Sequence, residues 1–177
     1  MDFVEVPSFL AQLNDNRSTA ARALEFTILN AARTSETLKA DWTEIDLEKA
    51  LWTIPAIRMK AAKEHRVPLS KPALALLAQL PSRRGPVFPG MKFGKPLSNM
   101  AMDMILRRMG IEVTVHGFRS SFRDWAGEMT NTPREVAEAA LAHTVGNSAE
   151  LAYRRGDALA KRRILMEDWG TYCGVTV

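Results

Sequence analysis

The sequence contains little cysteine and little histidine among its 177 residues. Cys173 is the single cysteine and has no partner within the chain, which excludes an internal disulfide framework and fits a reducing compartment. The three histidines, His65, His116 and His143, are far apart and lack the short paired spacing of zinc sites. We therefore expect no metal site.

Long apolar runs are also missing. No stretch approaches the roughly 20 apolar residues that a membrane span needs. Asp2 and Glu5 lie where a secretory signal peptide would carry positive charge, and no long apolar segment follows them. Internal repeats and low-complexity tracts are absent as well. These absences exclude an integral membrane protein and predict a cytoplasmic one.

What the chain does contain is typical of a folded domain. Hydrophobic residues make up 46% of the sequence and charged residues 25%, which is a usual balance for a globular protein. The length suits one domain, or one domain with a short extension. The formal net charge of +4 indicates a mild preference for polyanions. Many structural proteins are equally basic, so charge alone does not identify a nucleic-acid-binding protein.

Apolar spacing and cap residues predict an α+β fold that is mostly helical, with one small antiparallel sheet. Residues 1–18 have the character of a lead-in without regular structure, and Ser18 or Thr19 caps a first helix that ends at Arg33. Further helices are expected at 70–78, 98–109, 117–128, 133–142 (opened by a capping box at 132–135), 147–155 and from 157 onward. Strands are expected at 42–45, 51–54 and 65–68, with a basic hairpin tip at 58–64 and a proline-rich loop at 81–96.

Two arginines, two histidines and one tyrosine form a set suited to phosphodiester chemistry: Arg33, His116, Arg119, His143 and Tyr153. Arginine presents a planar, permanently charged fork that pairs two phosphate oxygens at once. Histidine moves a proton near neutral pH, and tyrosine supplies a hydroxyl that acts as a covalent nucleophile. Together these groups can hold a phosphodiester and attack it without a metal ion.

Each of these residues has a structural explanation that suffices when it is taken alone. The histidines fit helix caps or helix ends, and Arg119 fits an exposed surface position. Arg33 fits an exposed ion pair with Glu36, and Tyr153 fits a half-buried aromatic on a short basic helix. The lysines of the tip at 58–64 fit an ordinary solvated loop.

The joint order of the motifs changes this assessment. Along the chain follow Arg33-x-x-Glu36, a lysine-bearing hairpin ending in Val-Pro-Leu, His116-x-x-Arg119, Leu-Ala-His143 and Tyr153. This order resembles the catalytic domain of tyrosine recombinases, the phage-integrase family. The segments VHGFRSSFRDWAGE, LAHTVGNSAELAYRRGDALAKRR and MEDWGTYC are most similar to integrases of prophages and genomic islands. The resemblance extends from about Ala20 to Cys173 and implies a bacterial or phage origin.

The resemblance implies a catalytic role for each residue that matches a family motif. Arg33 and Arg119 would clamp the nonbridging oxygens of the scissile phosphate and offset charge in the transition state. Tyr153 would attack phosphorus, leaving a 3′-phosphotyrosyl bond and a free 5′-hydroxyl. His116 would assist proton transfer at the tyrosine or the phosphate, and His143 would hydrogen-bond the phosphate. Because the covalent bond stores the cleaved linkage, the resemblance implies no ATP, metal ion or other cofactor.

Other matching residues would support this chemistry. Glu36 would hold the arginines and His116 in place. Lys60 would be the general acid towards the 5′ oxygen, because it stands eight residues before Pro68, as the family lysine stands before its Val-Pro-Leu proline; Lys63 is the alternative. The residues expected to contact DNA are Lys63, Arg123, Arg154 and Arg155.

The resemblance also implies a domain organisation and partners. Residues 19–177 would form the integrase catalytic domain, a small three-stranded antiparallel sheet packed on a helical bundle, with 1–18 as a linker. The core-binding and arm-binding domains of the family are missing, so the chain is expected to be an excised domain or a natural truncation that binds DNA weakly and with strong salt dependence. The partner would be double-stranded DNA at attachment sites. The recombinase would form a tetramer on this DNA and would be a monomer or weak oligomer when free of it. The last helix would pack on its own domain or dock on a neighbouring protomer.

One departure and two alternatives accompany this interpretation. Tyr153 follows His143 by ten residues, one more than in many family members, although the most similar integrases share the extra residue. An inactive DNA-binding remnant remains open as another function. A type IB topoisomerase uses similar chemistry to relax supercoils, but the similarity of the three quoted segments to genomic-island integrases disfavours it.

Overall fold

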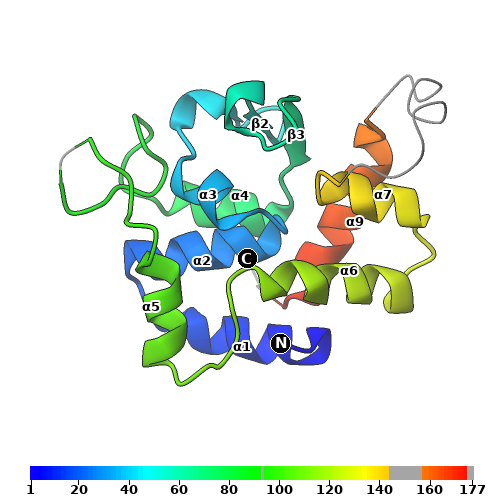
Figure 1. The fold of residues 1–177 in the computed structure, drawn as a ribbon, viewed down its shortest axis with the longest axis horizontal. Helices are drawn as coiled ribbons and strands as arrows, with labels where there is room; N and C mark the ends of the chain where they lie inside the picture. Colours follow the sequence, from blue (N-terminus) through cyan, green and yellow to red (C-terminus); the bar gives the residue numbers. More distant parts are fainter. Residues whose placement is uncertain (93, 144–156, 175–177) are drawn as a thin grey trace.

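The computed structural model describes residues 1–92, 94–143 and 157–174. Within them the chain is mostly helical with one three-stranded antiparallel sheet (Figure 1), which confirms the expected α+β class. The helical elements are η1 (Phe3–Glu5), α1 (Val6–Leu13), α2 (Thr19–Leu29), α3 (Thr34–Leu38), η2 (Trp42–Glu44), η3 (Ala56–Arg58), α4 (Lys71–Ala78), α5 (Ala101–Arg108), α6 (Gly117–Met129), α7 (Arg134–Ala140) and α9 (Leu159–Tyr172). The strands are β1 (Ile45–Asp46), β2 (Leu51–Ile54) and β3 (His65–Pro68).

Helix α2 lies at the centre of the molecule. The Ser18 hydroxyl caps it by accepting a hydrogen bond from the Ala21 amide at 3.3 Å, as the sequence predicted. Every residue from Ala21 to Leu29 is buried, and the helix contacts α1, α3, α4, α5 and α9. Its two charged residues, Arg22 and Glu25, pair with each other at 2.7 Å, which offsets the cost of burying them. In Figure 1, α2 runs between the sheet and α1.

The sheet has the strand order β1-β2-β3, and both pairs are antiparallel. Trp52 on β2 lies opposite Val67 on β3. The Trp52 ring is fully buried and packs on Phe26 of α2, with the ring centroids 5.4 Å apart. This aromatic contact attaches the sheet to the central helix. The expected strands at 51–54 and 65–68 are thus confirmed.

The first expected strand, at 42–45, is mostly wrong. Residues Trp42–Glu44 form the short helix η2, and β1 contains Ile45 and Asp46. The cause is local, because the Asp41 carboxylate accepts hydrogen bonds from both the amide and the hydroxyl of Thr43, at 3.0 and 2.8 Å. An aspartate that binds the backbone two residues further on favours a turn over an extended strand.

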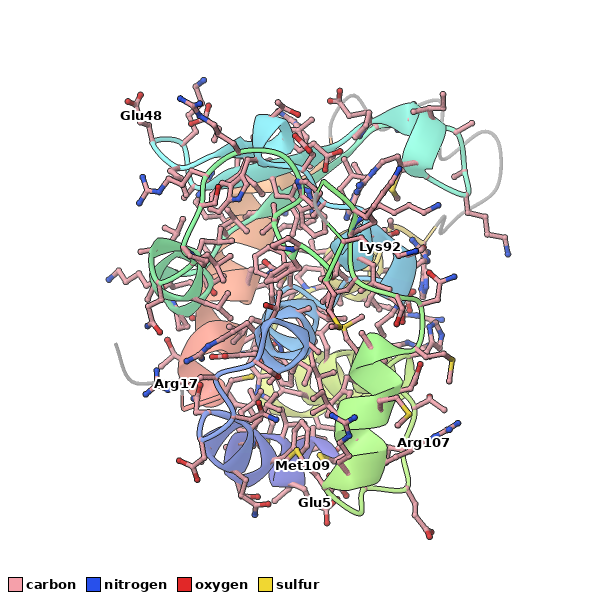
Figure 2. The ribbon with its side chains drawn as sticks, turned by 90° about the vertical axis from the view of Figure 1, so that its left-hand side faces the viewer. Glu5, Arg17, Glu48, Lys92, Arg107 and Met109 are labelled. Carbon is pink, nitrogen blue, oxygen red and sulfur yellow. The ribbon has the colours of Figure 1, made fainter. Side chains whose placement is uncertain are left out.

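The expectation of a lead-in without regular structure at 1–18 is also wrong. Most of this segment forms η1 and α1, and Pro7 fits because it lies in the first turn of α1, where no amide hydrogen is needed. Phe9 is buried and stacks on an aromatic ring of α6 at 5.3 Å. The segment therefore belongs to the common hydrophobic core. In Figure 2, Glu5 in this segment and Glu48 in the β1–β2 turn mark opposite ends of the molecule.

Helix α9 packs against its own chain, where it contacts α2, α4, α6 and α7. The buried Trp169 donates a hydrogen bond from Nε1 to the Ile28 carbonyl at 2.9 Å, and its ring lies 5.0 Å from that of Trp125. At Gly170 the helix approaches α4 so closely that an added Cβ would lie 2.7 Å from the Ser70 hydroxyl oxygen. Of the two expected arrangements of the last helix, the structure shows the one within its own domain.

Some helix starts differ from the expected ones. Helix α5 begins at Ala101 rather than at Ser98. The expected capping box at 132–135 is wrong, because α7 begins without a side-chain cap and the Thr132 amide donates instead to the Thr130 hydroxyl at 3.1 Å. The expected helix at 147–155 lies outside the described residues. None of the helices in the described ranges has the length and apolar character needed to cross a membrane.

Candidate active site

Arg33 lies at the start of α3, and not at the end of the first helix as expected, because α2 already ends at Leu29. Its guanidinium nitrogen Nη1 donates to Oε1 of Glu36 at 2.7 Å, and its backbone amide donates to Oε2 at 2.8 Å. Glu36 is buried and Arg33 keeps 24% of its side chain exposed. The predicted pairing is confirmed, and the carboxylate fixes the direction in which Arg33 points while leaving part of it open to solvent.

The second arginine, Arg119, is buried on α6 with 4% of its surface exposed, which excludes the surface position considered from the sequence. Its Nη1 donates to the Ala31 carbonyl at 2.5 Å, and its Nη2 donates to the Leu141 carbonyl at 2.6 Å. Arg33 also reaches the Leu141 carbonyl, at 3.4 Å from Nη2. Two arginines that are far apart in the sequence thus meet at the end of α7.

The ends of α2 and α7 make these carbonyls available. Each helix is followed by an alanine with left-handed backbone, Ala31 with φ 47° and Ala142 with φ 51°. The amide after each alanine donates to the carbonyl five residues back, at 3.0 Å after Ala31 and 2.9 Å after Ala142. This is the pattern of a Schellman C-cap, which usually uses glycine. The caps turn the chain so that nearby carbonyl oxygens face the arginines.

His143 follows the cap of α7 directly and contacts two charged groups. Its Nδ1 lies 2.7 Å from Oε2 of Glu138, and its Nε2 lies 3.1 Å from Nη2 of Arg119. A guanidinium can only donate, so Nε2 accepts and the proton of the neutral imidazole resides on Nδ1, from which it is donated to Glu138. The arrangement therefore assigns one tautomer to His143.

Glu138 is a site residue that the sequence interpretation missed. It is buried on α7, and Oε1 lies 2.9 Å from Nε of Arg123, one of the residues expected to contact DNA. Burial opposes its ionisation, but the hydrogen bond from His143 and the charge of Arg123 prevail and lower the pKa of Glu138. Its spacing of five residues before His143 would have been a usable signal, because a Schellman cap brings these two positions together.

His116 precedes α6 and is exposed. In the described chain its side chain makes no capping hydrogen bond, and the Gly117 amide instead donates to the Thr114 hydroxyl at 3.1 Å. The cap role considered from the sequence is therefore wrong. Partial burial and then the positive charges of Arg119 and Arg33 lower the pKa of His116. His116 therefore lies within the positive field of the two arginines.

The expected lysines lie on the connection between β2 and β3. Lys60 and Lys63 are both exposed, and the buried Met59 anchors the chain immediately before Lys60. The structure thus presents both amino groups to solvent, as a group that must reach into bound DNA would require. Tyr153, Arg154 and Arg155 lie outside the described residues.

His65 is a further group that the sequence interpretation left without a role. It begins β3, and burial followed by the positive charge of Arg162 lowers the pKa of His65 to about 4. The charges of Arg33 and Glu36 also act on it, in opposite directions. His65 is therefore neutral near pH 7 and places no further positive charge beside the arginines.

Among the described residues, the buried charge of Arg119 has no carboxylate as a direct hydrogen-bond partner, so the centre of the site is positive. Burial, followed by repulsion from Arg33, lowers the pKa of Arg119 to about 10, and attraction to Glu36 and Glu138 opposes this. Direct partners of Arg119 are two neutral carbonyls and an imidazole. Such a centre favours an incoming anion, and the two guanidinium groups suit the oxygens of a phosphate.

Across the described ranges, no group of three or more His, Cys, Asp or Glu side chains is placed to hold a metal ion.

Comparison with known proteins identifies the family. The sequence matches the model of the phage integrase family over residues 1–158. The chain belongs to this family. The match confirms the resemblance on which the roles of the site residues were predicted, while the roles themselves remain predictions.

The phage integrase family members most similar in sequence include proteins of bacteria and phages. Prophage integrase IntA of Escherichia coli strain K12 is 35% identical over 175 residues, which cover 92% of this chain and 42% of IntA. The integrase of Enterobacteria phage P4 is 35% identical over 189 residues, which cover 94% of this chain and 43% of the phage protein. The chain therefore spans less than half the length of these curated relatives.

A solved structure supports the fold. The integrase from mycobacterium phage Brujita matches with a TM-score of 0.70 over 90% of this chain and 55% of the phage protein, at 20% sequence identity. This likeness confirms the predicted integrase-type fold, in which a three-stranded sheet accompanies a mostly helical domain.

Proposed function

We propose that this chain is the catalytic domain of a site-specific DNA recombinase that cleaves and rejoins double-stranded DNA through a 3′-phosphotyrosyl intermediate. The observation that carries the proposal is the meeting of Arg33 and Arg119 at the Leu141 carbonyl, with His143 against Arg119. Two oriented guanidinium groups around one point suit the nonbridging oxygens of a phosphodiester. The imidazole of His143 accepts a hydrogen bond from Arg119 and helps to hold it in place. Membership of the phage integrase family supports the same reaction.

In the proposed cleavage step, a bond forms between the Tyr153 hydroxyl oxygen and phosphorus while the bond from phosphorus to the 5′ oxygen breaks. The electron pair of the broken bond goes to the 5′ oxygen, which takes a proton from Lys60. His116 accepts the tyrosine proton, and the lowering of its pKa by burial and the two arginines favours the neutral imidazole that can do so. Arg33 and Arg119 offset the charge that develops on phosphorus oxygens. Attack by a new 5′-hydroxyl reverses the step and rejoins the strand.

Two carboxylates would hold these groups without touching DNA. Glu36 orients Arg33. Glu138 holds the ring of His143 beside Arg119, whose Nη2 donates to Nε2 of His143. Preorganised donors avoid the cost of reorientation during the reaction, which is the main way in which such sites accelerate phosphoryl transfer.

DNA at attachment sites would be the substrate, and a tetramer of recombinase chains on DNA the working assembly. The residues proposed to contact DNA outside the active site are Lys63, Arg123, Arg154 and Arg155. Because lysine and arginine contacts to phosphates release counterions, we expect the affinity of this domain for DNA to fall steeply as salt is added.

The test is covalent trapping on a pool of nicked duplexes whose bases around the nick are randomised. Cleavage next to a nick releases a short fragment, so the adduct accumulates and survives SDS electrophoresis. We expect an adduct with the wild-type chain and none with Tyr153→Phe. Tyr172→Phe is the matched control, since the half-buried Tyr172 stacks on the core residue Trp169 and its loss of a hydroxyl should keep the adduct.

Arg119→Ala separates catalysis from binding. We expect it to lower the adduct rate by about 10²- to 10³-fold, as the loss of one transition-state donor does elsewhere, while DNA retention at low salt changes little. No adduct from the pool, or an adduct that Tyr153→Phe leaves intact, would contradict the proposal. DNA retention without any adduct would favour the inactive DNA-binding remnant.

A further inference from the structure

Arg58 ends η3, two residues before Lys60, and the interpretation of the basic hairpin tip gave it no role of its own. Its side chain is 15% exposed although it is charged. The guanidinium donates from Nη2 to the Glu36 carbonyl at 3.0 Å and from Nη1 to the Lys39 carbonyl. The same Nη2 lies 3.3 Å from the carboxylate of Glu44. A charged group held this way is an internal tether and is not available to bind DNA.

The two carbonyls place this tether at the end of α3. The last carbonyls of a helix have no partner within the helix, and a cation there is favourable. Arg33 stands at the other end of the same five-residue helix. Arg33 and Arg58 therefore hold opposite ends of α3, and Glu36 serves both, through its side chain to Arg33 and its carbonyl to Arg58.

The tether also includes the sheet. Glu44, which pairs with Arg58, accepts a hydrogen bond from Nε1 of the buried Trp52 on β2 at 3.0 Å. The backbone before Lys60 is fixed as well, because the amides of Arg58 and Met59 donate to carbonyls of Pro55 and Ala56 at 2.9 and 3.0 Å. Lys60 is thus the first exposed residue after two anchored ones.

We infer that Arg58 is a positioning residue that sets the distance between the lysine and the arginine clamp. Without its guanidinium, the connection from β2 to β3 loses its hydrogen bonds to the end of α3, and the backbone before Lys60 is then fixed less firmly relative to Arg33. The inference rests on the proposed function, in which Lys60 is the general acid. Lysine cannot replace Arg58 fully, because a single ammonium group lacks the planar fork that joins two carbonyls and a carboxylate.

The experiment compares two suicide substrates made from one sequence recovered from the trapping pool. One has an oxygen and the other a sulfur at the 5′ bridging position of the scissile phosphate. A thiolate leaves as the anion and needs no proton, so the sulfur substrate reports cleavage without the general acid. The ratio of the two cleavage rates within one variant is independent of the fraction of protein that is folded.

Arg58→Met should lower cleavage of the oxygen substrate by about 10- to 100-fold, the cost of a small misplacement of a catalytic group, and the sulfur substrate should restore most of the loss. Arg58→Lys should show a smaller effect in the same direction. Lys60→Ala, which removes the general acid itself, gives the largest difference between the two substrates for comparison.

Arg163→Met is the matched control. Arg163 also donates to two backbone carbonyls, those of Ala50 and Lys49 at 3.2 and 3.0 Å, but at the β1–β2 turn, so its rate ratio should equal that of wild type.

Equal losses of Arg58→Met on both substrates, with Lys60→Ala still rescued by sulfur, would overturn the inference and leave the proposed function intact. Rescue of Lys63→Ala in place of Lys60→Ala would also overturn it as stated. Failure of the wild-type chain to form any adduct on the trapping pool would instead reject the proposed function, so the two failures are distinguishable.

Discussion

The imidazole of His143 bridges Glu138 and Arg119, with Nδ1 2.7 Å from the carboxylate and Nε2 3.1 Å from the guanidinium. The bridge connects the buried arginine of α6 with the buried carboxylate of α7. It also decides which ring nitrogen carries the proton, because the arginine can only donate. The effect of this bridge on activity can be measured, and so can the effects of Ala142, Gly170 and His65 on stability.

Glu138→Ala should leave His143 free to rotate and to change tautomer. We expect adduct formation to fall by about 10- to 100-fold, as the loss of a carboxylate that orients a metal-bound histidine does elsewhere. Glu135→Ala, an exposed glutamate on the same helix, should retain the wild-type rate. Equal rates for Glu138→Ala and wild type would show that the bridge does not serve catalysis.

Ala142→Gly should stabilise the protein by about 1 kcal/mol, because a left-handed alanine costs energy that glycine does not. Ala142 has φ 51° at the end of α7. Ala139→Gly, within α7, should have the opposite sign and a similar size, since glycine weakens a helix interior. Urea unfolding of both variants measures the difference, and destabilisation by Ala142→Gly would disprove the C-cap explanation.

Gly170→Ala should destabilise the protein by about 1–3 kcal/mol, the cost of forcing an extra carbon into a packed interface. The added Cβ would lie 2.7 Å from Oγ and 2.9 Å from Cβ of Ser70. The double variant with Ser70→Gly should recover part of the loss. Gly127→Ala on α6 is the control, because nothing lies within 4 Å of its added Cβ, and it should stabilise by up to about 1 kcal/mol. The thermal midpoints of these variants test the closeness of α4 and α9.

His65 should make stability depend on pH. Burial, and then the charge of Arg162, lowers the pKa of His65 to about 4 in the folded state from 6.5. Between these values the unfolded chain binds the proton and the folded chain does not, so stability is full above the unfolded pKa and falls as pH drops towards 4. The loss is at most about 3 kcal/mol. Urea midpoints across this range should depend less on pH in His65→Gln than in wild type; identical slopes would contradict the assignment.

Local sequence signals predicted the elements that local forces decide. Ser18 and the apolar spacing after it predicted α2, and β-branched and aromatic residues predicted the strands at 51–54 and 65–68. Errors arose where a neighbouring side chain competed for the backbone, as Asp41 does before η2. The segment 1–18 was misjudged because its apolar residues gain their value from burial against α6, which no local signal reports.

The sequence by itself determined the family, the order of the site residues and the pairing of Arg33 with Glu36, since that pair lies within one turn of helix. Tertiary structure decided that Arg33 and Arg119 share the Leu141 carbonyl, that Glu138 orients His143, and that Arg58 ties the lysine connection to α3. The physical reason is the sequence distance over which each interaction acts. Caps and periodicity act over a few residues, whereas these contacts depend on where the ends of α2, α3 and α7 come to lie once the whole core has packed around them.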